Sequence, residues 1–308
     1  MHEVAVVLST YNGSRYIIEQ LDSILRQKDV HATVFIRDDG SDDNTVELIK
    51  STYIGNPDIK LTEGENIGVG NSFMECLYSI DVSCDYFCFS DQDDIWEEDK
   101  IISAIGKIKD KTVPCLYTSN QYLADSSGVK TGIRYIETPK LTYGNNLCSN
   151  RLSGCTFVWN TALQDILTDI KRRPDKGFLN IRIHDVWVVL AAFIAGEVIY
   201  DETPHILYRI HEKNYVGINE KNGIAGKIKN TISNIKSGKM TYRSRTCEEL
   251  VKRFGDLMSD EVLKNTKMYA DYLNDPRIKR EVLKGTPYFL ADNESVLSSK
   301  IKLCFNLW

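Results

Sequence analysis

The chain has 308 residues, of which 42% are hydrophobic, 10% aromatic and 26% charged, an ordinary composition for a soluble globular protein. It excludes a disordered tail, a collagen and a coiled coil, and the length allows one large domain or two moderate ones. The net charge of −5 is unevenly distributed, because residues 1–212 carry 20 basic and 32 acidic side chains and residues 213–308 carry 18 and 11. Nucleic acid is therefore a poor fit for the first part, and an anionic membrane surface is a candidate partner for the second.

Apolar stretches in the sequence are too short to cross a membrane. The longest, 186–195, has ten residues, whereas a helical span needs about 20. The few residues before position 4 contain neither the basic region nor the cleavage site of a signal peptide. We therefore expect a cytoplasmic protein whose eight cysteines are reduced.

Strand and helix patterns alternate over the first 120 residues, which predicts a parallel sheet with helical crossovers. Strands are expected at 4–8, 33–36, 59–61, 86–89 and 115–118, and helices at 14–27, 44–52, 71–80 and 100–108. The fold class is therefore α/β.

The pattern changes in the second half of the chain. The polar, glycine-bearing stretch 126–150 predicts a flexible segment over the sheet. A strand over 153–159, a helix over 161–170, an apolar helix beginning at Asp185 and short strands at 198–200 and 206–210 follow. After Gly217 helix formers dominate, with isoleucines at 224, 228, 232 and 235 in one apolar stripe, so we expect a domain over 1–217 and a helical region over 218–308.

Acidic clusters follow two of the predicted strands, at the edge where ligands bind in open α/β sheets. Asp91, Asp93 and Asp94 fall within four residues. Such crowding is costly unless a cation neutralises it, and an all-oxygen ligand set suits Mg²⁺ or Mn²⁺ holding a substrate phosphate. The alternative is a solvated turn that caps the next helix.

A second acidic turn, 38–45, has two interpretations of the same kind. One of its carboxylates can accept the N3–H of uracil or thymine while the turn holds the ribose, or the segment is simply a turn and helix cap. The first strand ends in 9–13, where the first crossover of a nucleotide-binding sheet begins. Neither GxGxxG nor GxxxxGK[ST] occurs, which argues against dinucleotide oxidoreductases and P-loop enzymes.

Seven motifs occur in a fixed order over residues 3–217. They are Ser9-Thr10-Tyr11-Asn12-Gly13, Arg37-Asp38-Asp39-Gly40-Ser41, Asn66-Ile67-Gly68, Asp91-Gln92-Asp93-Asp94-Ile95-Trp96, Ser153-Gly154-Cys155-Thr156, His184-Asp185-Val186-Trp187 and Tyr208-Arg209-Ile210-His211. This series resembles the family 2 glycosyltransferases of GT-A fold, and among them the bacterial rhamnosyltransferases of cell-wall and capsular polysaccharide synthesis.

The resemblance implies a Rossmann-like, mostly parallel mixed sheet and an inverting transfer from a nucleoside diphosphate sugar. Residues 1–120 would form the nucleotide-sugar half and 121–217 the acceptor half. The residues implied for nucleotide-sugar binding are Thr10, Tyr11, Asn12, Asp39, Asn66, Gly68, Asp91 and Gln92. Asp93, Asp91 and His211 would hold the metal, and Asp185 would be the catalytic base.

The chemistry supports two of these roles independently. An inverting displacement needs a carboxylate to take the acceptor proton and a cation to hold the diphosphate on the opposite side. Asp185 begins an apolar helix, whose N-terminus is expected to lower the pKa of that carboxyl. A plain helix cap is the alternative for Asp185.

Six further residues are expected around the acceptor or sugar: Trp96, Gly154, Cys155, His184, Trp187 and Arg209. Tryptophan offers a face for sugar stacking, although a tryptophan beside a motif is as often a core residue. Many relatives have a glutamate directly before the base, where this chain has His184, and the first tryptophan after the base is replaced by Val186. The shape of the acceptor pocket is therefore expected to differ.

The predicted function is transfer of rhamnose from dTDP-rhamnose to a polysaccharide or lipid-linked saccharide. A UDP-hexose or UDP-N-acetylhexosamine transferase is the alternative, since uracil and thymine both present an N3–H. A sugar-nucleotide nucleotidyltransferase is a further alternative, although no glycine-rich basic loop occurs between Val4 and Arg15. A carbohydrate-binding relative without activity would not need Asp91, Asp93 and Asp185 together. The basic residues of 218–245 suggest peripheral contact with the inner face of an anionic membrane.

Overall fold

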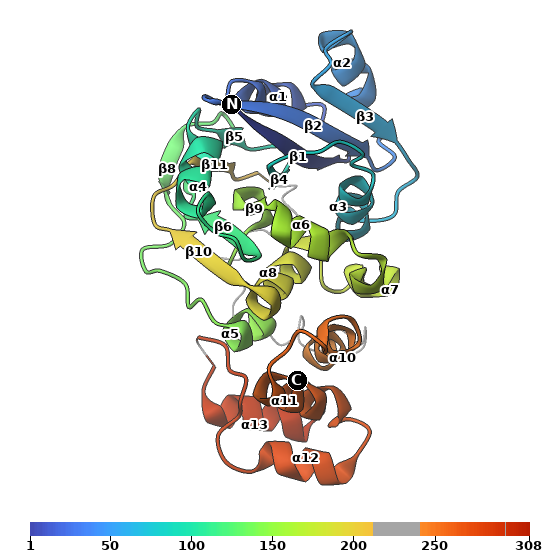
Figure 1. Ribbon diagram of the computed structural model, residues 1–308, viewed down its shortest axis with the longest axis vertical. Helices are drawn as coiled ribbons and strands as arrows, with labels where there is room; N and C mark the ends of the chain where they lie inside the picture. The colour runs from blue at the N-terminus through green and yellow to red at the C-terminus, as the bar shows by residue number, and fades with distance from the viewer. Residues whose placement is uncertain (212–240, 293) are drawn as a thin grey trace.

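The computed structural model describes residues 1–211, 241–292 and 294–308. A seven-stranded sheet in the order β10-β6-β9-β4-β1-β2-β3 forms its centre, with helices on both faces (Figure 1). The strands are β1 (His2–Thr10), β2 (Val30–Asp38), β3 (Ile59–Glu63), β4 (Tyr86–Ser90), β6 (Cys115–Ser119), β9 (Val158–Asn160) and β10 (Glu197–Asp201). The helices around it are α1 (Ile17–Leu25), α2 (Thr45–Thr52), α3 (Val69–Tyr78), α4 (Lys100–Ile108), α6 (Thr161–Thr168) and α8 (His184–Ala195).

The sheet is mostly parallel. β1 pairs in parallel with β2 and β4, and β2 pairs in parallel with β3, whereas β9 runs antiparallel to β4 and β6. The carboxyl ends of β1, β2 and β4 therefore lie at one edge, where Thr10 pairs with Asp38 and Leu8 pairs with Ser90. The expected mixed α/β fold is confirmed, and so are its first five strands and four helices.

Alternating side chains of the strands divide the core into two layers. On β1, Ala5 and Val7 face the layer with α3, α6 and α8, whereas Val4, Val6 and Leu8 face the layer with α1, α2 and α4. This period of two matches a strand that is buried on both faces, which explains the unbroken apolar run of β1.

The stretch 126–150 was expected to be a flexible segment, and the structure corrects this. It contains β8 (Lys130–Ile133) and α5 (Tyr143–Cys148). β8 belongs to a second sheet, in the order β5-β11-β7-β8, with β5 (Ile95–Trp96), β7 (Tyr122–Ala124) and β11 (Ile206–Arg209). The strand predicted over 153–159 is shorter than expected, because a 3₁₀ turn, Gly154–Thr156, precedes β9. A second 3₁₀ turn (Ile170–Arg172) and α7 (Lys176–Leu179) lie between α6 and α8.

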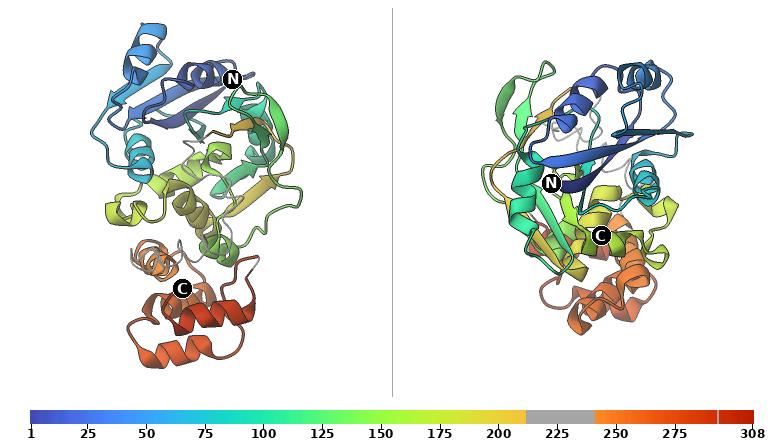
Figure 2. Two further views of the ribbon diagram at one scale, coloured as in Figure 1. Left: turned by 180° about the vertical axis from the view of Figure 1, so that it is seen from behind. Right: turned by 45° about the horizontal axis from the view of Figure 1, so that its top comes forward.

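The C-terminal region is helical, as expected. It consists of α10 (Tyr242–Phe254), α11 (Asp260–Asp271), α12 (Pro276–Leu283) and α13 (Val296–Cys304), gathered at the end of the molecule remote from β1–β3 (Figures 1 and 2). Trp187 of α8 packs between Phe178 and Phe254, at ring distances of 5.4 and 5.1 Å. The region therefore shares a hydrophobic core with the α/β domain.

Two predictions about the chain between these regions lie outside the described residues. These are the domain boundary near Gly217 and the isoleucine stripe from Ile224 to Ile235. Among the described residues, no helix combines the length and the apolar character that crossing a membrane requires.

Candidate active site

A cavity of about 740 Å³ opens at the carboxyl edge of the central sheet. Asp39, Asp91, Asp93 and Asp185 all line it, although they come from three separate segments of the chain. Tyr11, Asn66, Gly68, Gln92, Gly154 and His184 also line it, so most of the predicted site residues meet in one place. The fold therefore brings together the motifs of the first 120 residues and the His184-Asp185 motif at the start of α8.

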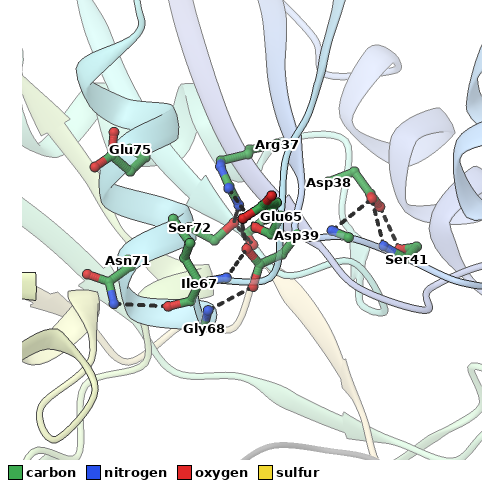
Figure 3. Close-up of polar contacts among 12 residues, drawn as sticks. Arg37, Asp38, Asp39, Ser41, Glu65, Ile67, Gly68, Asn71, Ser72 and Glu75 are labelled. Carbon is green, nitrogen blue, oxygen red and sulfur yellow. Dashed lines mark hydrogen bonds and ion pairs between the residues drawn. The ribbon is translucent and has the colours of Figure 1, made fainter. Parts of the chain in front are cut away.

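Asp39 anchors the loop that leads into α3 (Figure 3). Its Oδ1 accepts from the Ile67 N–H at 2.9 Å and pairs with the Arg37 guanidinium, and its Oδ2 accepts from the Gly68 N–H at 3.0 Å. Arg37 also donates to the carbonyl of Glu65 at 2.9 Å. Gly68 has φ +86, a conformation that other residues rarely adopt. Asp39 therefore fixes this wall of the cavity, and Oδ2, with one donor shown, retains capacity to accept from a ligand.

Asp38 and Asn12 hold the neighbouring turn. Asp38 accepts from the backbone N–H groups of Gly40 and Ser41 and from the Ser41 hydroxyl, so the cap interpretation applies to this carboxylate (Figure 3). Asn12 accepts from the Asp42 N–H at 2.9 Å and does not line the main cavity. It lines a second hollow of about 780 Å³.

Gln92 joins the end of β1 to the acidic motif after β4. Its Oε1 accepts from the Thr10 hydroxyl at 2.6 Å and the Tyr11 N–H at 2.9 Å, and its Nε2 donates to the Tyr11 carbonyl at 3.1 Å. Thr10 is fully buried and does not line the cavity, so it acts through Gln92. These contacts explain why both motifs occupy adjacent strand ends.

The two carboxylates expected to hold a metal have different surroundings. Burial and the neighbouring carboxylates of Asp93 and Asp185 raise the pKa of Asp91 to about 7. Asp93 Oδ2 lies 2.8 Å from His211 Nε2, so the structure brings these two predicted metal ligands together. Asp93 lines both hollows, and His211 lines the second one.

A buried polar cluster lies beneath this motif. Asp91, Asp94 and Cys155 have potential ligand atoms within 4.8 Å of one another. Asp94 and Cys155 are almost fully buried, and burial raises the pKa of both well above the usual range. Lys100 is buried nearby, and burial lowers its pKa. Asp94 and Cys155 do not line the cavity, whereas Asp91 and Asp93 do, so the latter two are the better candidates for a cation that holds a ligand there.

Asp185 stands at the first turn of α8 and faces the cavity. The Val186 N–H donates to its Oδ1 at 2.6 Å, and Asn150 Nδ2 lies 3.4 Å from its Oδ2. The expected lowering of its pKa is wrong in sign, because burial outweighs the backbone hydrogen bonds and raises the pKa of Asp185 to about 6. A carboxylate with that pKa is ionised at neutral pH and is a better proton acceptor than an exposed aspartate.

His184 forms the cavity wall beside Asp185. Its ring stacks on Phe73 at 3.8 Å and meets Phe89 edge-on at 4.8 Å. Burial lowers the pKa of His184 to about 3, so the imidazole is neutral. A Cβ at Gly154 would lie 3.1 Å from both His184 Nε2 and Asp185 Cβ, which explains the glycine.

Four residues predicted around the acceptor or sugar do not line the cavity: Trp96, Cys155, Trp187 and Arg209. Trp96 is 3% exposed and lies against the Lys100 ammonium, 3.7 Å from the ring centroid, and Trp187 belongs to the core shared with α10. Arg209 is 1% exposed and pairs with Glu19 at 2.6 Å. These side chains are buried because they join layers of the fold.

Cavity residues that the motifs did not indicate include Asn150, Arg134, Arg182 and Tyr242, and Tyr208 lines the cavity as a motif residue to which no role was assigned. Arg182 lies three residues before Asp185, so its position in the sequence was the available signal. Nothing in the sequence marks Tyr242, since it lies in the C-terminal region.

Comparison with solved structures defines the class of protein. TarS from S. aureus in complex with UDP matches with a TM-score of 0.57 and 16% identity, covering 92% of this chain and 75% of that one. The chain therefore has the GT-A glycosyltransferase fold.

The particular family follows from the sequence. The family model Glycosyl transferase family 2 matches residues 5–167, and the chain belongs to this family of glycosyltransferases. It is 34% identical over 220 residues to dTDP-rhamnosyl transferase RfbG of Shigella flexneri, covering 69% of this chain and 74% of the relative. It is 31% identical over 137 residues to chondroitin synthase of Pasteurella multocida, covering 44% of this chain and 14% of the relative.

Proposed function

We propose that this protein is an inverting glycosyltransferase that moves rhamnose from dTDP-rhamnose onto a polysaccharide or lipid-linked saccharide. The observation that carries the proposal is the single cavity that Asp39, Asp91, Asp93 and Asp185 share. The similarity to a dTDP-rhamnosyl transferase supports the donor. In this proposal Asp39 binds the nucleobase, Asp91 and Asp93 hold the cation that binds the diphosphate, and Asp185 removes the proton.

Proton removal belongs to Asp185. Its carboxylate takes the proton from the acceptor hydroxyl as that oxygen attacks the anomeric carbon, and single displacement from the side opposite the leaving group inverts the configuration. Burial supports this role, because a pKa of about 6 leaves the group ionised at neutral pH. Asn150 and the Val186 N–H hold the carboxylate in place.

Asp91, Asp93 and His211 fit Mg²⁺ or Mn²⁺. The donors are two carboxylates and an imidazole, and the crowding of acidic groups that raises the pKa of Asp91 is relieved by a cation. A divalent cation held there would neutralise charge on the departing diphosphate. Asp39 Oδ2 is the proposed acceptor for the N3–H of the base, and Tyr11, Asn66 and Gly68 lie around it in the cavity wall.

A UDP-hexose or UDP-N-acetylhexosamine donor is the alternative, since Asp39 would accept the same N3–H from uracil. A relative from Escherichia coli, described as UDP-Glc:alpha-D-GlcNAc-diphosphoundecaprenol beta-1,3-glucosyltransferase WfgD, is 26% identical over 159 residues. Titration of dTDP and UDP with and without Mn²⁺ discriminates between the nucleotides.

The proposed setting is the cytoplasm, with peripheral contact between 218–245 and the inner face of an anionic membrane. The support is compositional, because residues 213–245 hold eight basic side chains and one acidic one. Reversal of Lys227, Lys229, Lys236 and Lys239 to glutamate should release the protein from anionic liposomes. Equal liposome binding by variant and parent would contradict this contact.

The stereochemical proposal can be tested without knowing the acceptor, because water can serve as one. Early NMR spectra of dTDP-rhamnose hydrolysed by the enzyme should show rhamnose with the anomeric configuration opposite to that of the donor. Retention of configuration would contradict the single displacement. If the enzyme hydrolyses a UDP-sugar but not dTDP-rhamnose, the donor is the alternative, a UDP-hexose or UDP-N-acetylhexosamine.

A further inference from the structure

Three arginines line the cavity, and they differ in how their charge is compensated: Arg134, Arg151 and Arg182. Arg151 lies 3.7 Å from a carboxylate oxygen of Asp292. Arg134 donates to the side-chain oxygen of Gln121 at 2.9 Å, and its charge lowers the pKa of Asp91, on the diphosphate side of the cavity. Arg182 differs from both, because within the described residues it has neither an ion pair nor a hydrogen bond to another side chain.

Arg182 is half-buried near Asp185, and no carboxylate of the described residues forms an ion pair with it. Its Nη2 donates to the carbonyl of Leu147 at 2.9 Å, and its Nε is buried with no hydrogen-bond partner among the described residues. Burial lowers the pKa of Arg182, whereas the charge of Asp185 acts in the opposite direction. A partly desolvated guanidinium without an ion pair is stabilised when an anion binds it, and its planar fork matches phosphate or carboxylate.

Tyr242 covers the guanidinium of Arg182 from the C-terminal region. The Arg182 carbon lies 4.8 Å from the Tyr242 ring centroid, and the Tyr242 hydroxyl donates to the carbonyl of Cys148 at 3.2 Å. The next residue, Arg243, is neutralised by Glu294, whose two oxygens lie at 3.1 and 2.9 Å. The first turn of α10 therefore supplies an aromatic wall to the cavity, while its own arginine is paired elsewhere.

These groups lie on the acceptor side of the cavity. Asp185 marks that side, because the base of a single displacement stands opposite the leaving group. Arg182 is three residues from Asp185 and is among the charges that lower the pKa of that carboxyl against the effect of burial. Asn150, in the segment just after α5, reaches the same carboxylate.

We propose that Arg182 and Tyr242 form a subsite for an oxyanion of the acceptor, so that the C-terminal helical region completes the acceptor site. The inference rests on the proposed function, because Asp185 defines the acceptor side only in a transfer reaction. The oxyanion is a phosphate or a carboxylate close to the accepting hydroxyl. A saccharide diphosphate and an acidic sugar are the two sources of such a group.

The test uses small anionic sugars as probes. The full-length protein, saturated with dTDP and Mg²⁺, is titrated by calorimetry with glucose 1-phosphate, glucuronate and methyl glucoside. Binding of at least one anionic sugar should be tenfold or more tighter than that of methyl glucoside. The preferred anion identifies phosphate or carboxylate as the recognised group.

Matched variants assign the site. Arg182→Met should weaken the anionic probe at least tenfold, because it removes a charged hydrogen-bonding group, and Tyr242→Ala should weaken it severalfold. Arg173→Met is the control, because Arg173 stacks on Tyr78 at 3.9 Å outside the cavity and its loss should leave the probe affinity unchanged. Arg182→Lys keeps the positive charge but not the planar guanidinium, so its affinity for the anionic probe should lie between those of the parent and Arg182→Met. This variant gives a second test if the methionine variant does not fold.

Three results would overturn the subsite. These are equal probe affinity in the parent and the Arg182 variants, no anion preference in the parent, and displacement of dTDP by the probe, which would place the oxyanion on the donor side. If the parent binds neither dTDP nor UDP, the proposed function fails separately. The same titration without nucleotide then still decides whether Arg182 holds an oxyanion.

Discussion

Replacing Asp185 with asparagine should abolish base catalysis while preserving the donor site. The amide retains an oxygen that can accept from the Val186 N–H, but it cannot take a proton from the acceptor. Turnover should fall by roughly 10² to 10⁴, the usual contribution of general base catalysis, with the affinity for dTDP unchanged. The assay is release of dTDP from dTDP-rhamnose over pH 4.5 to 8.

The pH profile of the parent adds an independent signature. With a pKa of about 6, the ionised form of Asp185 is lost below that pH, so turnover should fall about tenfold per pH unit below pH 6 and level off above pH 7. The Asp185→Asn variant should lack this dependence. A variant with near-normal turnover, or a parent profile flat down to pH 4.5, would refute Asp185 as the base.

The unfolding free energy of Asp185→Asn distinguishes a loss of catalysis from a loss of folding. Since the pKa of Asp185 is raised on folding, its carboxyl favours the folded state fully below about pH 3.8 and loses that contribution as the pH rises through about 6. At pH 8 the asparagine variant should therefore be more stable than the parent, by up to about 3 kcal/mol. A less stable variant at pH 8 would show that burial does not dominate at this site.

Three further perturbations test separate parts of the structure. Asp93→Ala should remove the metal dependence of dTDP binding, so a variant whose affinity for dTDP still rises with Mn²⁺ as much as that of the parent would exclude Asp93 from the metal site. Burial lowers the pKa of His184 to about 3 in the folded state, so its contribution to stability is lost as the pH falls below about 6.5. Between pH 7 and pH 5 the unfolding free energy of the parent should therefore fall by about 2 kcal/mol more than that of His184→Gln. A parallel loss in both proteins, measured by urea unfolding, would show that the imidazole is not buried. Trp187→Ala should destabilise the fold by about 3 to 5 kcal/mol, because the fully buried ring joins α8 to α10. A loss of less than about 1 kcal/mol of unfolding free energy in the same assay would contradict that packing.

The parts of the fold that the sequence predicted are those with strong local signals. The apolar period of the first strands and the acidic residues after them predicted the ligand-binding edge, and Asp39, Asp91 and Asp185 meet there. The stretch 126–150 was misjudged because β8 is stabilised by pairing with β7, a tertiary contact that overrides a polar, glycine-bearing composition.

Side-chain roles were harder to predict where burial decides them. Trp187 and Arg209 belong to quoted motifs but are buried away from the cavity, which sequence proximity cannot show. The pKa of Asp185 rises because burial exceeds the effect of the helix terminus, and burial is a property of the whole fold. The contact between Arg182 and Tyr242 joins residues 60 positions apart and has no local signal.

The most direct test of the account is the thermal unfolding of the protein with dTDP-rhamnose, UDP-glucose and UDP-N-acetylglucosamine, each with Mn²⁺ or Mg²⁺ and again with a chelator. A nucleotide sugar at 100 times its dissociation constant should add about 2.7 kcal/mol of stability. The account predicts that dTDP-rhamnose gives the largest increase and that the chelator removes most of it. Stabilisation by none of the three sugar nucleotides at millimolar concentration would contradict it.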